Sequence, residues 1–477
     1  MENSERALLL NRQRTESSTP NLSLLFAIIC IVDVFGVFPI VSLPKAVIDC
    51  GWKGIPLVIF VCSLQMYTAV LLGKCWIIAE EIQPRIQSKN RYPYSALAEI
   101  TYGETLAKIV TFLLDATILC AGIPNLILAS QNLQLVGMNL TNNEFNMSFC
   151  YWMIIIGMVM CPFLWLGSPK DMKCLCTVSV CIVSSVFILI FLSIISDDGT
   201  ASSARTMPYY SQPYVWQNLL SGYGIITFQY DIHPTILTIL VDMQNKMEIG
   251  KAVLGGFFVS LGFFSITCLA VYVHFGTEIG PSILEMLPST ITVHFCAILV
   301  AVQLMLSSAI GNSALYQHIE DYFGIPREFN YKRCIMRSVV AVFSIILAES
   351  VPRFDLVMSL LGGALTGPLV YLLPPLFFMR MLTLQDAHLN TIQMEAVYNT
   401  AVDEKDTLPT DFGKINHGYF KIRFRKAQVA FCMFIISCGF CTTLATTYWN
   451  IVNTIRYVHF SPPCIVNIYN STQWWQV

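Results

Sequence analysis

The sequence contains few charged residues. Of its 477 residues, 12% are charged and 55% are hydrophobic, whereas a soluble domain usually carries about 25% charged residues. This deficit indicates that most of the chain does not face water. The net charge of −2 does not suggest nucleic-acid binding, so we predict no nucleic-acid partner.

A metal motif and a secretory leader are also lacking. Most of the 17 cysteines lie inside apolar stretches, and no CxxC pair with zinc-site spacing stands in a loop. We therefore predict no metal site and no cofactor. The first 20 residues are polar, and the apolar run that follows exceeds the roughly 7–15 residues of a signal-peptide core. That run is predicted to stay in the membrane as the first span.

The sequence is rich in long apolar runs. A helix needs about 20 mostly apolar residues to cross a hydrocarbon core of roughly 30 Å. Eleven segments qualify or nearly qualify, and the fourth and ninth are short. They are residues 22–44, 55–79, 106–131, 151–166, 174–195, 217–241, 252–275, 291–316, 334–348, 356–379 and 429–449. We predict an all-α polytopic membrane protein with a polar N-tail (1–21), an eleven-span transmembrane domain (22–450) and an extracytosolic C-tail (451–477).

The placement of basic residues predicts a cytosolic N-terminus. With that orientation 21 Lys and Arg residues fall on the cytosolic side and five on the other, as the positive-inside rule requires. Three N-x-S/T sequons then lie on the extracytosolic side, where glycosylation occurs. They are Asn139, Asn146 and Asn470.

Two further signals concern the outer face and trafficking. Cys50, Cys150 and Cys464 lie on the extracytosolic side, and a disulfide between two of them is one expectation that sequence alone cannot assign. The N-tail stretch E-R-A-L-L-L, with Glu5, Leu9 and Leu10, fits an acidic dileucine signal for sorting to endosomes, lysosomes or vesicles. The plasma membrane remains the alternative location.

Span 1 contains residues that interrupt a helix. It reads D-V-F-G-V-F-P-I-V-S-L-P from Asp33 to Pro44. Transporters bind solutes where such helices unwind near the bilayer centre. A charge within a span usually faces an interior cavity, so Asp33 is either an ion or substrate-amine site or a paired carboxyl that holds helices together. The substrate-binding candidates here are Val37, Phe38, Pro39 and Ser42.

Span 6 carries a similar interruption. It reads S-G-Y-G-I-I-T-F-Q-Y-D-I-H-P from Ser221 to Pro234. A free helix N-terminus in the break would attract a carboxylate. His233 is either a carrier of a coupled proton or a histidine bonded to its neighbours. The substrate-binding candidates are Gly222, Gly224, Thr227, Phe228 and Tyr230.

The two interruptions each fall on the first helix of a set of five spans. This arrangement is typical of a 5+5 inverted-repeat transporter, with span 11 as an accessory helix. Ser307 and Asn312 in span 8 are candidate cation ligands, although bonding between helices is the commoner role of such residues. Asp115 in span 3 is a weaker candidate for facing the pathway.

These motifs resemble those of the amino acid/auxin permease family, which includes vesicular inhibitory amino acid, proton-coupled and sodium-coupled neutral amino acid transporters. The similarity rests on F-Q-Y-D-I-H-P in span 6, S-L-L-G-G-A-L-T-G-P-L-V-Y-L-L-P-P in span 10 and Leu43-Pro44 before Gly51-Trp52. It implies a LeuT-like fold with discontinuous helices 1 and 6 and a site between spans 1, 3, 6 and 8. The sequence departs from the family at V-F-P-I-V-S, where the family usually has a glycine-rich turn.

The resemblance implies secondary active transport of an amino acid, coupled to H⁺ or Na⁺ by symport or antiport. The alternative, which the altered span 1 turn leaves open, is an amino acid sensor of the same fold that transports little. An ion channel lacks a recognisable filter, and no set of enzymatic residues stands out in the spans.

Overall fold

The computed structural model describes residues 22–89, 92–141, 147, 149–165, 169–196, 215–277, 279–326, 329–350, 354–403 and 415–457. Within these ranges the chain is helical, apart from turns and one isolated bridge between Leu22 and Met243. Each of the eleven predicted spans contains helix in this described part, with interruptions in spans 1 and 6. The expected all-α polytopic architecture is therefore confirmed.

Seven helical stretches of the described chain are long and apolar enough to cross a membrane. The helices that form them are α5 (Gly54–Ile82), α7 (Glu104–Leu140), α9 (Pro169–Ile195), α12 (Ile249–Phe275), α14 (Ile291–Gly311), α18 (Leu373–Asp403) and α19 (Ile415–Tyr457). Span 10 enters α18 through α17 (Phe354–Leu361) and two π-helical segments, η4 (Gly362–Thr366) and η5 (Pro368–Leu372).

The other four predicted spans differ in form. Span 4 is the short α8 (Phe149–Trp165), and span 9 is α16 (Tyr331–Ser350), which is longer than its apolar core predicts because it begins in a basic turn. Span 1 is divided into α2 (Leu24–Phe35), α3 (Phe38–Val41) and α4 (Leu43–Asp49), and span 6 into α10 (Val215–Gln229) and α11 (His233–Asp242). The two discontinuous helices are thus those the sequence predicts.

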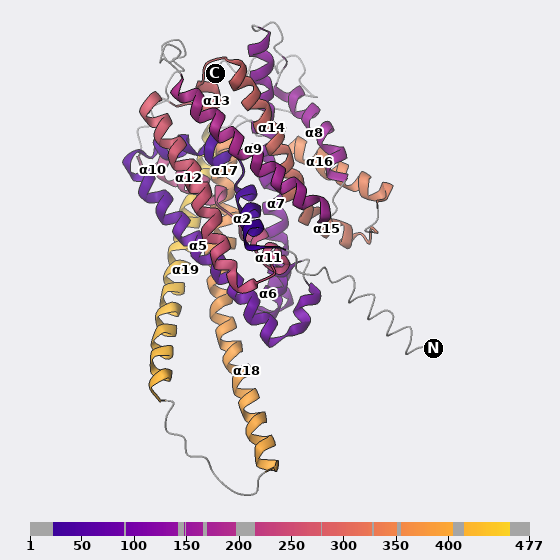
Figure 1. Cartoon of the computed structure of the whole chain (residues 1–477), viewed down its shortest axis with the longest axis vertical. Helices are drawn as coiled ribbons and strands as arrows, with labels where there is room; N and C mark the ends of the chain where they lie inside the picture. Colours follow the sequence, from indigo (N-terminus) through magenta and orange to yellow (C-terminus); the bar gives the residue numbers. More distant parts are fainter. Residues whose placement is uncertain are drawn as a thin grey trace.

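Short helices connect the spans. They are η1 (Gly51–Lys53), η2 (Pro84–Lys89), α6 (Pro93–Tyr102), η3 (Lys246–Glu248), α13 (Ile283–Met286) and α15 (Ser313–Tyr322). Figure 1 shows the spans gathered in one bundle, with α18 and α19 extending together beyond the end at which α6 and α11 lie. In the bundle α14 packs against both α7 and α9, and α2 packs against α12.

The break in span 1 follows from two residues. Gly36 adopts a φ of 61°, which L side chains rarely tolerate, and so ends α2. Four residues after Phe35 stands Pro39, which has no amide hydrogen to donate to the Phe35 carbonyl. The helix therefore cannot continue through this point with its backbone bonds intact.

The break in span 6 lies later than its glycines suggest. α10 continues as a regular helix past Gly222 and Gly224 and ends at Gln229. A Cβ added to Gly224 would lie 2.4 Å from the Ser359 carbonyl oxygen, so this glycine permits close packing against α17. The interruption itself is Tyr230–Ile232, and Pro234 opens α11, where a missing amide hydrogen costs nothing.

Candidate functional site

A cavity of about 160 Å³ lies where the two breaks meet α7 and α14. Span 1 contributes the end of α2 and the residues after it, and span 6 contributes both sides of its break. The lining residues are Asp33, Val34, Phe35, Gly36, Phe38, Thr117, Ile118, Ala121, Gly122, Asn125, Phe228, Gln229, Asp231, Pro234, Thr235, Gln303, Leu304, Ser307, Ser308, Ile310, Gly311 and Asn312. Two of these residues are acidic and none is basic.

Two glutamines satisfy carbonyls that the breaks leave without helix donors. Gln229 Nε2 donates to the Phe35 carbonyl at 2.7 Å, which replaces the bond that Pro39 cannot make. Gln65 Nε2 of α5 donates to the Thr227 carbonyl at 2.7 Å, because the Asp231 amide bonds to Phe228 instead. Span 6 thus holds the end of α2 directly, and α5 holds the end of α10.

Asp33 is a buried carboxylate on the cavity wall, with 2% of its surface exposed. Ser179 and Cys176 of α9 hydrogen-bond to it, and Gln303 Nε2 of α14 donates to the Ser179 hydroxyl at 3.3 Å. Its Oδ1 has no hydrogen-bond partner in the structure. Asp33 therefore links three helices while one oxygen is left for a proton or a cation.

His233 lies behind the cavity wall and is fully buried. Its Nδ1 is 3.1 Å from Asp231 Oδ1, and its Nε2 is 3.0 Å from the Thr68 hydroxyl of α5. That hydroxyl also lies 3.0 Å from the Leu64 carbonyl. It can donate to a neutral imidazole, or accept from a protonated one while it donates to Leu64. The site therefore accommodates His233 in either protonation state.

The other predicted residues divide into two groups. Phe38, Phe228, Ser307 and Asn312 line the cavity. The remaining substrate-binding candidates are not among its lining residues; they are Val37, Pro39, Ser42, Gly222, Gly224, Thr227 and Tyr230. Tyr230 is buried with its ring against Phe35 and Phe257, so it supports the break from behind.

Several lining residues were not predicted from the sequence. Gln229 and Gln303 stand in apolar runs, and Asn125 Nδ2 donates to the Ser308 hydroxyl at 2.9 Å across α7 and α14. All three are polar residues within spans, but their hydrogen-bond partners lie far away in the chain. Asp115, the weaker candidate in span 3, is bonded to His318 of α15 and is not among the lining residues.

The predictions for the outer face are only partly within the described residues. Asn139 lies in the last turn of α7, while Asn146, Asn470 and the sorting residues Glu5, Leu9 and Leu10 lie outside the described residues. Cys150 is disulfide-bonded, and Cys50 is a free, buried thiol. Of the three outer cysteines, Cys50 is therefore excluded from the bond.

The fold and the site together define a class. The chain is an integral multi-pass membrane protein in which two interrupted helices, 1 and 6, border a small central cavity, as in LeuT-like transporters. A solved structure of MhsT in complex with L-phenylalanine has the same fold, with a TM-score of 0.50 and 11% identity, over 78% of this chain and 98% of that one.

The chain belongs to the transmembrane amino acid transporter protein family, whose model matches residues 23–402. It is similar to amino acid transporter AVT1I of Arabidopsis thaliana, with 21% identity over 360 residues, covering 72% of this chain and 82% of that protein. It is also similar to the vesicular inhibitory amino acid transporter of Xenopus tropicalis, with 24% identity over 370 residues, 72% of this chain and 67% of that one. The resemblance drawn from the sequence is confirmed.

Proposed function

We propose that this protein is a secondary active transporter of small amino acids with uncharged side chains, driven by protons. The observation that carries the proposal is Asp33, a buried carboxylate on the cavity wall with one oxygen unbonded. A buried carboxylate without a basic residue beside it in the cavity is stable only when it holds a proton or a cation. Release of that proton on one side of the membrane would couple its movement to that of the substrate.

The two breaks offer complementary ends for a zwitterion. α2 ends and α11 begins at the same cavity. A helix C-terminus carries partial negative charge and favours an ammonium group, whereas a helix N-terminus favours a carboxylate. The end of α2, with Asp33, would therefore receive the amine, and Pro234 and Thr235 in the first turn of α11 mark where the carboxylate would lie.

The cavity also restricts the side chain of the substrate. Its volume of about 160 Å³ is below the roughly 300–1,000 Å³ of sites for drug-sized ligands. Because Asp33 and Asp231 line it without a basic residue, an acidic side chain would meet like charge. These features favour small neutral amino acids over acidic ones.

The remaining elements of the proposal follow from the charge distribution. Basic residues on one side favour a cytosolic N-terminus. We further propose a cytosolic N-tail (1–21), a transmembrane domain (22–450) and an extracytosolic C-tail (451–477). The three sequons would be glycosylated, and the dileucine signal would direct sorting. Vesicular or lysosomal membranes are the locations that such a signal would select.

The test is uptake of labelled amino acids into proteoliposomes, with an imposed proton gradient, a sodium gradient or neither. We expect accumulation of small neutral amino acids with the proton gradient alone. D33N should abolish proton-driven accumulation, because an amide cannot release a proton. D115N is the matched control, since Asp115 does not line the cavity, and it should retain coupled uptake.

Two results would change the proposal. Accumulation that requires sodium would assign Asp33 to a cation site instead. Absence of any flux, together with saturable amino acid binding, would favour the second candidate, a sensor. One observation favours that candidate: Phe38–Val41 closes the span 1 turn as the short helix α3, whose amides bond within span 1, so fewer backbone groups are left for a substrate.

A further inference from the structure

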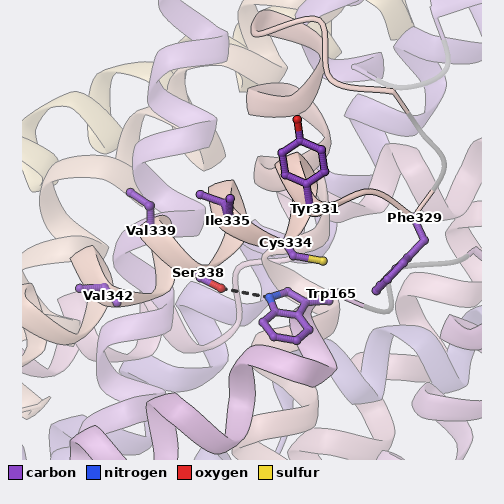
Figure 2. Close-up of a pocket in the computed structure, with 8 residues that line it drawn as sticks. All are labelled: Trp165, Phe329, Tyr331, Cys334, Ile335, Ser338, Val339 and Val342. Atoms are coloured by element: carbon purple, nitrogen blue, oxygen red, sulfur yellow. Dashed lines mark hydrogen bonds between the residues drawn. The ribbon is translucent and has the colours of Figure 1, made fainter.

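A second cavity lies on the outside of the bundle, away from the site described above. It is a groove of about 730 Å³ formed by the end of α8, the residues before α16 and the outward face of α16. The lining residues are Trp165, Phe329, Tyr331, Cys334, Ile335, Ser338, Val339 and Val342. Figure 2 shows the Trp165 indole hydrogen-bonded to the Ser338 hydroxyl, with Phe329 and Cys334 beside it.

The wall of this groove is fixed by buried charges on the opposite face of α16. Arg337 Nε donates to Glu320 Oε1 of α15 at 2.7 Å, and its guanidinium donates to the Leu164 carbonyl at the end of α8. Arg333 forms a second ion pair with Glu320 at 2.9 Å. These bonds hold α16, the helix that forms most of the groove wall, against both α15 and α8.

The outward face of α16 is apolar and exposed. Ile335, Val339 and Val342 are 59%, 62% and 52% exposed, and they follow one another along a single stripe of the helix. In a span of a membrane protein such a stripe lies in hydrocarbon. The stripe begins beside Tyr331 and Phe329, exposed aromatic residues of the kind found at the membrane–water interface.

An exposed basic residue stands in the first turn of α16, directly after Tyr331, which lines the groove. Lys332 is exposed and forms no ion pair with any residue in the described part of the chain. By contrast, Lys108 and Lys251 each pair with a glutamate one turn away. Lys332 precedes Val339 by two helical turns, so both lie on the same side of α16.

We propose that this groove binds an anionic glycerophospholipid of the leaflet that contacts the basic ends of the spans. One acyl chain would lie along Ile335, Val339 and Val342 and contact Trp165. The phosphate would be held by Lys332, which forms no ion pair with a described residue. A basic residue near the membrane surface attracts acidic head groups, whereas a zwitterionic lipid would gain only the apolar contact.

The test uses quenching of Trp165 fluorescence by brominated lipid. The purified full-length protein is placed in phosphatidylcholine nanodiscs that contain increasing fractions of dibrominated phosphatidylglycerol or, separately, dibrominated phosphatidylcholine. The Trp165 component is the difference between the native protein and W165F. We expect half-maximal quenching at about a fivefold lower fraction of the anionic lipid, the preference that one lysine near the membrane surface confers.

Matched variants assign the preference to the groove. K332Q should bring the two half-maximal fractions together, whereas K251Q, at an exposed lysine of α12, should leave them apart. V339F fills the groove and should weaken quenching of Trp165 by either lipid, whereas V178F, at an exposed valine of α9, should not. Equal half-maximal fractions for both lipids in the native protein, or identical behaviour of K332Q and K251Q, would overturn the proposal, because Trp165 would then report only general exposure to the bilayer.

Discussion

The bond between Gln229 and the Phe35 carbonyl gives a sharp test of how the central site is held together. Pro39 removes the backbone donor that this carbonyl would have in a continuous helix, and Gln229 Nε2 supplies the replacement at 2.7 Å. Gln229 is 7% exposed. Replacement by methionine, which has similar length but no donor, would leave a carbonyl without its protein partner beside the cavity.

The expected cost follows from this geometry. An unsatisfied buried acceptor costs about 1–3 kcal/mol, which corresponds to roughly 5–150-fold in the equilibrium that forms the break. Because Gln229 joins span 6 to the end of α2, the loss should fall on the site as well as on overall stability. We expect Q229M to lower the melting temperature in detergent and to raise the KM for uptake.

The matched control is Gln385, whose side chain bonds to Glu81 on the exposed surface of α18 and α5. Surface substitutions of this kind usually change stability by no more than about 0.5 kcal/mol, so Q385M should melt and transport like the native protein. If Q229M and Q385M are indistinguishable in both assays, the glutamine does not support the break, and the reasoning from Pro39 fails.

Three further predictions follow from other parts of the structure. Cys150 is disulfide-bonded, and we expect Cys464 to be its partner because it is the remaining outer cysteine; non-reduced peptide mapping that links Cys150 to any other residue would contradict this. A Cβ on Gly362 would lie 1.8 Å from a backbone oxygen of α10, so G362A should cost about 1–3 kcal/mol, whereas G262A, with open space around it, should be neutral or stabilising in the same melting assay. Burial raises the pKa of Glu285 in α13 to about 7. The neutral carboxyl therefore stabilises the fold fully below about pH 4.5, and this contribution is lost as the pH rises through 7. E285Q should flatten the pH dependence of the melting temperature, and an unchanged profile would contradict the assignment.

The sequence predicted the spans and the two interrupted helices because these depend on local composition. Apolar length identifies a span, and Gly36 with Pro39 cannot continue a helix whatever surrounds them. The position of the second break was predicted less well. Glycine has two roles, and Gly224 serves close packing against α17 where a broken helix was expected. Sequence alone does not distinguish these roles, since the deciding neighbour is more than a hundred residues away.

The central site was predicted only in part for the same reason. Phe38, Phe228, Ser307 and Asn312 were identified because they stand near breaks or are polar within a span, and they line the cavity. Gln229 escaped notice although it stands inside the span 6 motif. Its function depends on the carbonyl that Pro39 leaves without a donor, and only the folded chain brings the two together.

The contrast between Asp33 and His233 indicates where coupling to a proton should arise. The Thr68 hydroxyl beside His233 contacts both the Leu64 carbonyl and the imidazole. Both ring nitrogens of His233 therefore have a hydrogen-bond partner in Asp231 or Thr68. Asp33 instead joins α2 to α9 and, through Ser179, to α14, with one oxygen unbonded at the cavity. Loss of its proton places an uncompensated charge among three helices, and relief of that charge requires water, a cation or a substrate amine to enter the cavity. Ionisation of Asp33 is therefore the event that would link the state of the cavity to the packing of the bundle.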